Sequence, residues 1–222
     1  LILVLMTITG AIYPAIDLTA GERERGTLET VMVTPVPVLH LIIGKFLVVA
    51  TVGMLAATLN LASVAATMHF GGLTQAISQD RPVKFPLVTI PIILICMVPF
   101  SLLFSAILVA VCSFARTFKE AQNYVVPVII GAMIPAVGVT LPSVRLEGVL
   151  LVVPVGNMVL LARDLFQQTY TWSQVVMVLL STSFYAAAAV AVAAKLFGQE
   201  AVLFADAGSY KTLFQRRLFR PS

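Results

Sequence analysis

The stretch LILVLMTITGAIYPAI, residues 1–16, is followed shortly by GERERGTLETVMVTP, residues 21–35. The first stretch contains no charged side chain, whereas residues 22–29 of the second contain five. A charged side chain is costly within a bilayer unless it reaches water, an interface or a polar pocket. The sequence therefore predicts that residues 1–16 form the end of a membrane span, and that residues 22–29, the charged block, lie outside the bilayer just before the next span.

The overall composition indicates a polytopic membrane protein. Of the 222 residues, 59% are hydrophobic and 11% are charged, and the mean hydropathy is +1.01. A soluble domain has about 25% charged residues. Residues 1–16 have neither a basic n-region nor a small-residue cleavage motif, so they do not indicate a signal peptide. Because the chain opens inside an apolar run, we expect it to be part of a longer protein.

Uncharged runs predict an all-α fold with five transmembrane helices. A span needs about 20 residues, and the candidate runs are residues 1–16, 46–79, 85–115, 121–144 and 165–194. The helical part of the second run is expected to end near Phe70, and the last span to begin near Trp172. Small residues gather at 56–66 and 186–194, which favours close helix packing.

Residues 148–162 form a sixth apolar segment that is too short to cross a membrane. Pro154, Gly156 and Asn157 lie in its middle and are expected to interrupt it. Two interpretations stay open: a re-entrant hairpin that lines a pathway, and an interfacial helix. Irregular backbone at membrane depth is tolerated only where protein covers it or where it lines a cavity.

The distribution of Lys and Arg predicts the orientation. If the charged block is cytoplasmic, ten basic residues lie on that side and four on the other, as the positive-inside rule requires. The cytoplasmic set is Arg23, Arg25, Lys45, Arg116, Lys119, Lys195, Lys211, Arg216, Arg217 and Arg220, and the outer set is Arg81, Lys84, Arg145 and Arg163. We therefore expect a multi-pass protein of the cell membrane, with a membrane domain at 1–198 and a basic cytoplasmic tail at 199–222.

The motifs of an enzyme are missing from the sequence. Cys96 and Cys112 lie too far apart in one run to pair, and His40 and His69 are isolated, so we expect no metal site. No glycine-rich loop with a lysine is present, which excludes an ATP site of a known motif in this chain. Serines within the spans are expected to bond between helices. The net charge of +4 comes from residues that flank apolar runs, so we expect no nucleic-acid partner.

The charged block has the pattern of a short amphipathic helix. Glu22, Glu24 and Arg25 would face water, while Thr27 and Leu28 would face the membrane or a partner. Prolines at 35 and 37 would end the helix before the next span. A membrane subunit presents a rigid element to a soluble partner in this way, although an ordinary charged loop between two spans has the same composition.

Four strings resemble those of type-2 ABC exporter permeases. The first is ERERGTLETVMVTPV at 22–36, which is followed by LIIGK at 41–45. The second, SFARTFKEAQNY at 113–124, is similar to a cytoplasmic turn in the sodium-extrusion branch of that family. The others are PVGN at 154–157 with LLARDL at 160–165, and QEAVLF at 199–204. The strings occur in the family's order, but a first span and an extracytoplasmic domain of the family pattern are not in this chain.

The resemblance implies a half-transporter that pairs with a second, identical or different permease and with ATP-binding subunits. ATP and magnesium would be bound by those subunits, and this chain would contain no cofactor. The residues implied to couple the permease to the ATPase are Glu22, Arg23, Glu24, Arg25, Gly26, Thr27, Leu28 and Glu29, with Arg116, Lys119 and Glu120 as a second contact. The exported solute would be sodium, another small cation or a drug.

Two other functions stay open at this stage. One is the scaffold part of a membrane protein fused to an intramembrane protease, although these residues contain no protease motif. An ATP-independent transporter is the other alternative, and it would place ionisable side chains within the spans. Asp17 is the nearest such residue, and we place it at the cytoplasmic end of its helix.

Overall fold

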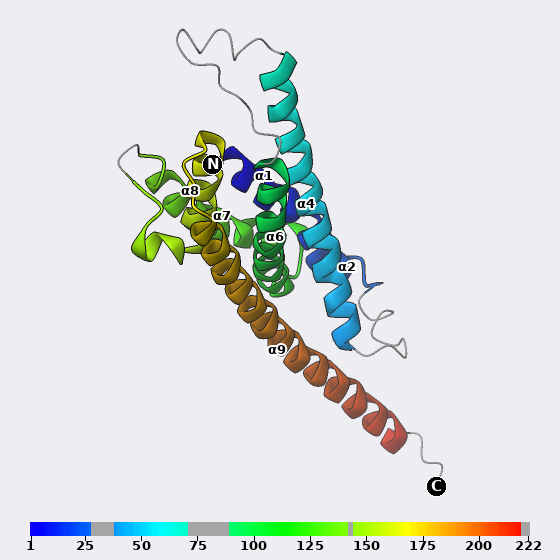
Figure 1. Cartoon of the computed structure of the whole chain (residues 1–222). Helices are drawn as coiled ribbons and strands as arrows, with labels where there is room; N and C mark the ends of the chain where they lie inside the picture. The colour runs from blue at the N-terminus through cyan, green and yellow to red at the C-terminus, as the bar shows by residue number, and fades with distance from the viewer. Residues whose placement is uncertain (28–37, 71–88, 142–143, 219–222) are drawn as a thin grey trace.

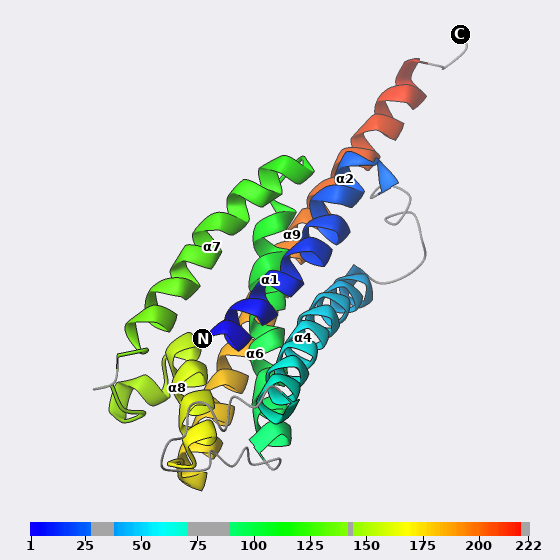
Figure 2. The ribbon, with the colours of Figure 1, turned by 90° about the horizontal axis from the view of Figure 1, so that it is seen from above.

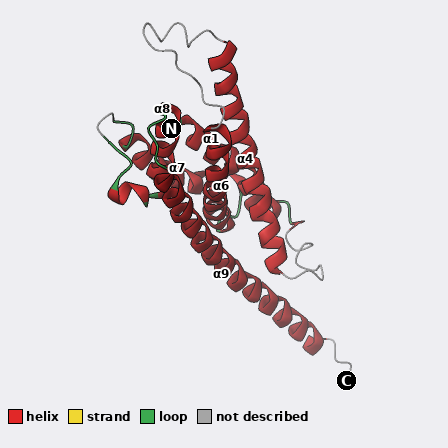
Figure 3. Cartoon of the chain, viewed as in Figure 1, coloured by secondary structure: helices red, strands yellow, loops and turns green. Residues whose placement is uncertain are grey.

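The computed structural model describes residues 1–27, 38–70, 89–141 and 144–218, and side-chain surroundings at 1–27, 40–67, 89–141 and 144–196. Every regular element in these ranges is a helix (Figure 3). In chain order they are α1 (Ile2–Ile16), the π-helical turn η1 (Asp17–Gly21), α2 (Glu22–Glu24), α4 (Val38–Phe70), α6 (Thr89–Ser113), α7 (Phe118–Gly138), the 3-10 turn η2 (Gly148–Leu151), α8 (Pro154–Gln167) and α9 (Trp172–Leu218).

Five of the described helices are long and apolar enough to cross a membrane, which confirms the predicted fold class. The candidate spans are Ile2–Glu24, His40–Thr67, Thr89–Ser113, Phe118–Gly138 and Trp172–Leu196. The second span starts earlier than predicted, because α4 begins at Val38 rather than near residue 46. The two predictions closest to the structure are the end of α4 at Phe70 and the start of α9 at Trp172.

Helix α6 is the centre of the bundle. Figure 2 shows α7 on one side and α4 on the other, with α1 and α6 between them. The bundle buries 72% of the α6 span but only 22% of the α7 and α9 spans. A helix that is apolar on all sides is suited to burial in the middle of a bundle, and the surfaces that α7 and α9 leave open are available to lipid or to another subunit. Helix α9 continues past the other helices (Figure 1).

Small residues allow α1, α4 and α6 to approach closely, as the composition predicts. A Cβ atom added to Gly10 of α1 would lie 2.5 Å from the Cβ of Ala56 on α4. A Cβ added to Gly53 of α4 would lie 3.1 Å from the carbonyl oxygen of Thr7. Beside this contact the hydroxyl of Ser101 on α6 donates a 2.7 Å hydrogen bond to the Ala50 carbonyl, so a serine does join two spans here.

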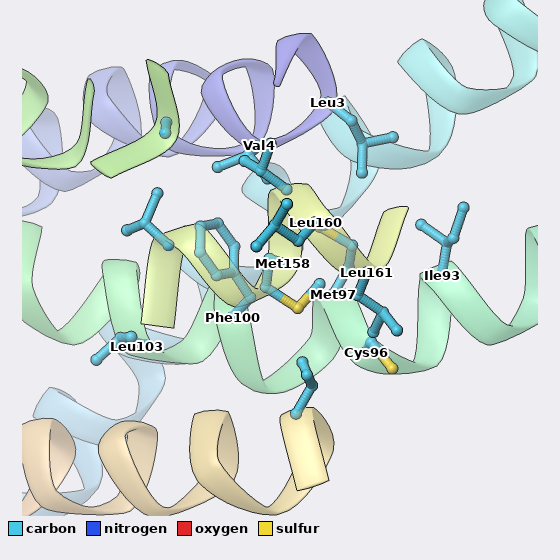
Figure 4. Packing of buried hydrophobic residues seen from close by; sticks show 14 of the residues in the cluster. Leu3, Val4, Ile93, Cys96, Met97, Phe100, Leu103, Met158, Leu160 and Leu161 are labelled. Carbon is cyan, nitrogen blue, oxygen red and sulfur yellow. The ribbon is translucent and has the colours of Figure 1, made fainter. Parts of the chain in front are cut away.

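Helix α8 is buried at the end of the bundle where the chain begins. Its residues Met158, Leu160 and Leu161 pack with Val4 of α1 and Phe100 of α6 in the larger of two apolar clusters (Figure 4). The prediction of an interruption at Pro154 and Gly156 is wrong. Pro154 is the first residue of α8, where its fixed φ and missing N–H suit a helix start, and the break comes just before it.

Prolines also lie inside helices that continue past them: Pro14 in α1, Pro99 in α6, and Pro127 and Pro135 in α7.

The two cysteines, Cys96 and Cys112, are buried on α6 and free, which confirms that they do not pair.

Candidate functional site

In its described part, residues 22–27, the charged block extends the first span by one short helix, α2 (Glu22–Glu24). Helix α1 passes without a break into η1 and α2. Gly26 then adopts φ +71°, a left-handed conformation that typically follows the end of a helix. Among the described residues the block is helical at Glu22–Glu24 and again at Thr27, so the predicted amphipathic helix stays a prediction. Leu28 and Glu29 lie outside the described residues, so their predicted roles stay predictions.

Lys45 binds the charged block to the start of α4. Its ammonium group donates to the Glu22 carboxylate at 2.5 Å and to the Leu18 carbonyl of η1 at 2.6 Å. The two side chains of this ion pair are 15% and 19% exposed. Glu22 therefore does not face open water as the pattern predicted. Removing one partner of a partly buried ion pair therefore destabilises the protein more than removing one partner of an exposed pair.

The block is also linked to its own helix by an exposed ion pair. Arg25 lies 2.7 Å from the Asp17 carboxylate, and the Arg25 side chain is 63% exposed. Pairs of this kind contribute about 0–1 kcal/mol. Asp17 lies at the end of α1 next to the block, where the sequence placed it.

Two further contacts join the block to the turn between α6 and α7. The guanidinium of Arg23 donates to the carbonyl of Ala115 at 3.2 Å. The carboxylate of Glu24 accepts from the backbone N–H of Phe118, the first residue of α7, at 2.7 Å. The first N–H groups of a helix have no partner within the helix, and negative charge is favourable there. Glu24 thus stabilises the start of α7 from another span.

The α6–α7 turn is held by a variant of the capping box. The hydroxyl of Thr117 accepts from the Glu120 N–H at 3.2 Å, and the Glu120 carboxylate accepts from the Arg116 N–H at 2.8 Å. The other oxygen of Glu120 accepts from the hydroxyl of Tyr124 at 2.7 Å. Because both oxygens have partners in the turn, Glu120 positions the turn, and the exposed residues Arg116 and Lys119 present charge outward.

The structure therefore brings the predicted block and the predicted second contact together at one end of the bundle. It also adds Lys45 and Phe118, which were not among the predicted coupling residues. Lys45 had a signal, because it is a single charge at the edge of an apolar run. No sequence signal points to Phe118, because it contacts Glu24 through its backbone N–H and not through its side chain.

The third predicted set, Pro154, Gly156 and Asn157, lies at the other end of the bundle. The Asn157 amide nitrogen donates to the Leu151 carbonyl and to the Ser181 hydroxyl, both at 3.2 Å. These bonds fasten α8 to η2 and α9. The Asn157 carbonyl oxygen is buried and has no hydrogen-bond partner among the described residues. Gly156 packs closely, since an added Cβ would lie 3.3 Å from a methyl group of Val139.

No group of three or more His, Cys, Asp or Glu side chains that suits a metal ion is found within the described residues.

Comparison with known proteins shows the family of the chain. No curated protein and no solved structure matches it. A family model described as ABC-2 family transporter protein matches residues 1–195, which include all five candidate spans except the final residue of the last. The membrane component of such a transporter is a permease and is not itself catalytic. The chain belongs to the ABC-2 transporter family, as its membrane permease component.

Proposed function

We propose that this permease belongs to an ATP-driven exporter and that the charged block couples it to a separate ATP-binding subunit. The observation that supports the proposal is the set of contacts from one short block to three spans. Glu22 binds α4 through Lys45, and Glu24 binds the start of α7, while the block itself continues α1. A force applied to the block would therefore reach α1, α4 and α7 together.

Two groups of residues have different tasks in this proposal. Glu22, Arg23 and Glu24 bind the block to the bundle. The exposed residues around them form the surface for the ATP-binding subunit: Arg25, Gly26 and Thr27 of the block, with Arg116 and Lys119 of the turn. Because its charged groups are basic, we expect an acidic patch on the partner. ATP and magnesium are bound by that subunit, and a second permease completes the membrane part.

The described residues support a cytoplasmic position for the block. The basic residues Arg23, Arg25, Lys45, Arg116, Lys119 and Lys195 lie at or near the block's end of their spans, and Arg145 and Arg163 belong to the segments at the other end. Under the positive-inside rule, this end is cytoplasmic in the cell membrane. The C-terminal residues would then also be cytoplasmic. Helix α9 continues unbroken through the proposed boundary at residue 198.

The proposed solute is sodium, another small cation or a drug, on the strength of the resemblance of residues 113–124 to the sodium-extrusion branch. The buried amide of Asn157 is the proposed pathway residue, with Pro154 and Gly156 setting the position of its helix. Sodium accumulation in inside-out vesicles tests the solute: uptake that needs ATP and this chain supports sodium, and uptake equal to that of vesicles lacking the chain contradicts it.

The coupling proposal is tested with the double variant Arg116→Glu and Lys119→Glu. Both side chains are exposed, so the fold is expected to survive, while association with the ATP-binding subunit should fall at least tenfold. The matched control is Arg145→Glu, which reverses an exposed charge at the other end of the bundle. Co-purification and ATPase activity of the assembled complex are measured. Wild-type association of the double variant would overturn the proposal.

A further inference from the structure

An apolar groove runs between α6 and α9 on the outside of the bundle. Its volume is about 380 Å³, it is open rather than enclosed, and no polar atom lines it. Alanines form much of its wall: Ala106 and Ala110 on α6, and Ala188, Ala189 and Ala193 on α9. These short side chains leave a channel between the two helices that larger residues would fill.

The position of the groove relates it to one leaflet of the membrane. On α6 the lining residues extend from Leu103 to Val111, in the half of Thr89–Ser113 that ends near the charged block. Eight residues of helix correspond to about 12 Å at 1.5 Å per residue. One leaflet contributes about 15 Å to a hydrocarbon core of about 30 Å. The groove is therefore long enough to hold most of an acyl chain within one leaflet.

The end of the groove near the charged block carries a positive charge and an aromatic ring. Ala188 and Val192 line the groove on α9, and Lys195 lies seven and three residues further on, so it continues the same helix face. Its side chain is exposed and has no hydrogen-bond or ion-pair partner among the described residues. In the turn just after α6, Phe114 is 55% exposed and follows the lining residue Val111 by three residues.

We propose that this groove binds a phospholipid with an anionic headgroup from the leaflet on the side of the charged block. One acyl chain occupies the alanine-lined channel, the phosphate accepts from the ammonium group of Lys195, and Phe114 lies at the level of the headgroup. Lysines at a membrane surface attract anionic lipids, with about 1 kcal/mol for each basic residue. That this leaflet is the cytoplasmic one rests on the orientation given under the proposed function, but lipid binding itself does not.

The test measures lipid retained by the full-length protein, purified without ATP and with any subunits that stay bound to it. The protein is purified from vesicles of phosphatidylcholine with phosphatidylglycerol, and bound lipid is counted by native mass spectrometry. Ala110→Phe fills the channel, and Lys195→Gln removes the charge. The matched controls are Ala187→Phe, an exposed position of α9 outside the groove lining, and Arg145→Gln, an exposed basic residue at the other end of the bundle.

We expect Ala110→Phe to abolish the retained phosphatidylglycerol. Lys195→Gln should lower its affinity about fivefold, which corresponds to the loss of one basic contact of about 1 kcal/mol, and both controls should retain it. Equal retention in all variants overturns the proposal. So does a disulfide between the Val192→Cys residues of two copies of the chain, formed when an oxidant is added, because the groove would then be covered by a second copy. No measurement in this test depends on ATP hydrolysis. A failure of the lipid proposal therefore leaves the coupling proposal intact, and a failure of the coupling proposal leaves the lipid proposal intact.

Discussion

The carboxylate of Glu24 lies 2.7 Å from the backbone nitrogen of Phe118, a residue 94 positions further along the chain. The Phe118 ring in turn meets the ring of Tyr13 on α1, with 5.7 Å between the centroids. The first residue of α7 is therefore held by two residues of the first span, one through its backbone and one through its side chain. These contacts make the start of α7 dependent on the position of the charged block.

Replacing Glu24 should weaken both the bundle and its coupling. Glu24→Ala leaves the start of α7 without its carboxylate, at a cost of about 1–2 kcal/mol by analogy with the loss of a helix cap. Glu24→Gln keeps an acceptor oxygen and should lose about half as much. Melting of the purified permease and ATPase activity of the complex are the measurements. Glu147→Gln, at an exposed carboxylate of the other end, is the control; wild-type values for Glu24→Ala would show that the contact transmits nothing.

The Glu22–Lys45 pair should matter more than the Arg25–Asp17 pair. Lys45→Met leaves the half-buried Glu22 carboxylate without its partner, and we expect a loss of about 2–3 kcal/mol, below the 3–5 of a fully buried pair. Arg25→Met breaks an exposed pair and should cost about 0–1 kcal/mol. Melting temperatures in detergent compare the two variants. Equal losses would mean that burial does not distinguish these pairs.

The contact of α1 with α4 should tolerate no larger residue at position 10. Gly10→Val places new atoms where the Ala56 Cβ already lies within 2.5 Å of an added Cβ, and overpacking of this kind costs about 1–3 kcal/mol. Gly131→Ala on α7 is the matched control, because an added Cβ there meets nothing within 4 Å. It should leave stability unchanged or raise it by up to about 1 kcal/mol through helix propensity. A stable Gly10→Val protein would contradict the close crossing of the two helices.

Asn157→Asp should destabilise the protein in a pH-dependent way. The position is fully buried and its side-chain oxygen has no partner among the described residues, so an ionised carboxylate would lose its hydration without compensation. A carboxyl group in the unfolded chain ionises near about pH 4, whereas the buried group keeps its proton to higher pH. Stability of the variant relative to wild type should therefore fall as the pH rises above about 4.

The control for this pH dependence is Asn157→Leu. It removes the two bonds of the amide nitrogen together with the unpartnered oxygen, and its effect should not change with pH because leucine does not ionise. Melting at two pH values separates the variants. If Asn157→Asp melts at a constant interval below wild type at both values, the carboxyl group is hydrated there and the buried position is wrong.

The spans could be predicted from the sequence because uncharged runs of sufficient length have few other structures available to them in a membrane. The end of α4 at Phe70 and the start of α9 at Trp172 followed the same pattern. The early start of α4 could not be predicted in this way. In the sequence the charge of Lys45 ends the apolar run, and only the structure shows that its ammonium group binds Glu22. A charge inside a helix is predictable only when its partner is known.

The candidate site was predicted in part, and the part that could not be predicted has a physical reason. The charged block and the α6–α7 turn were each recognised, yet their contact depends on a backbone N–H, which no sequence pattern displays. The resemblance implied that Glu120 belongs to the second ATPase contact, but no sequence pattern showed that its oxygens accept hydrogen bonds from Arg116 and Tyr124. At the other end of the bundle, an apolar run with Pro154 in its middle predicts a break, because proline inside a helix interrupts it, whereas Pro154 begins a helix here.

The π-helical turn Asp17–Gly21 has a consequence for the direction in which the carboxylates point. A wider turn holds about one residue more than an α-helical turn, and one residue of an α-helix corresponds to a rotation of about 100°. Loss of a single residue from this turn would leave the membrane part of α1 where it is but swing Glu22 and Glu24 about the helix axis, away from Lys45 and Phe118. The angular setting of Glu22 and Glu24 relative to the other helices thus depends on one additional residue in a single turn.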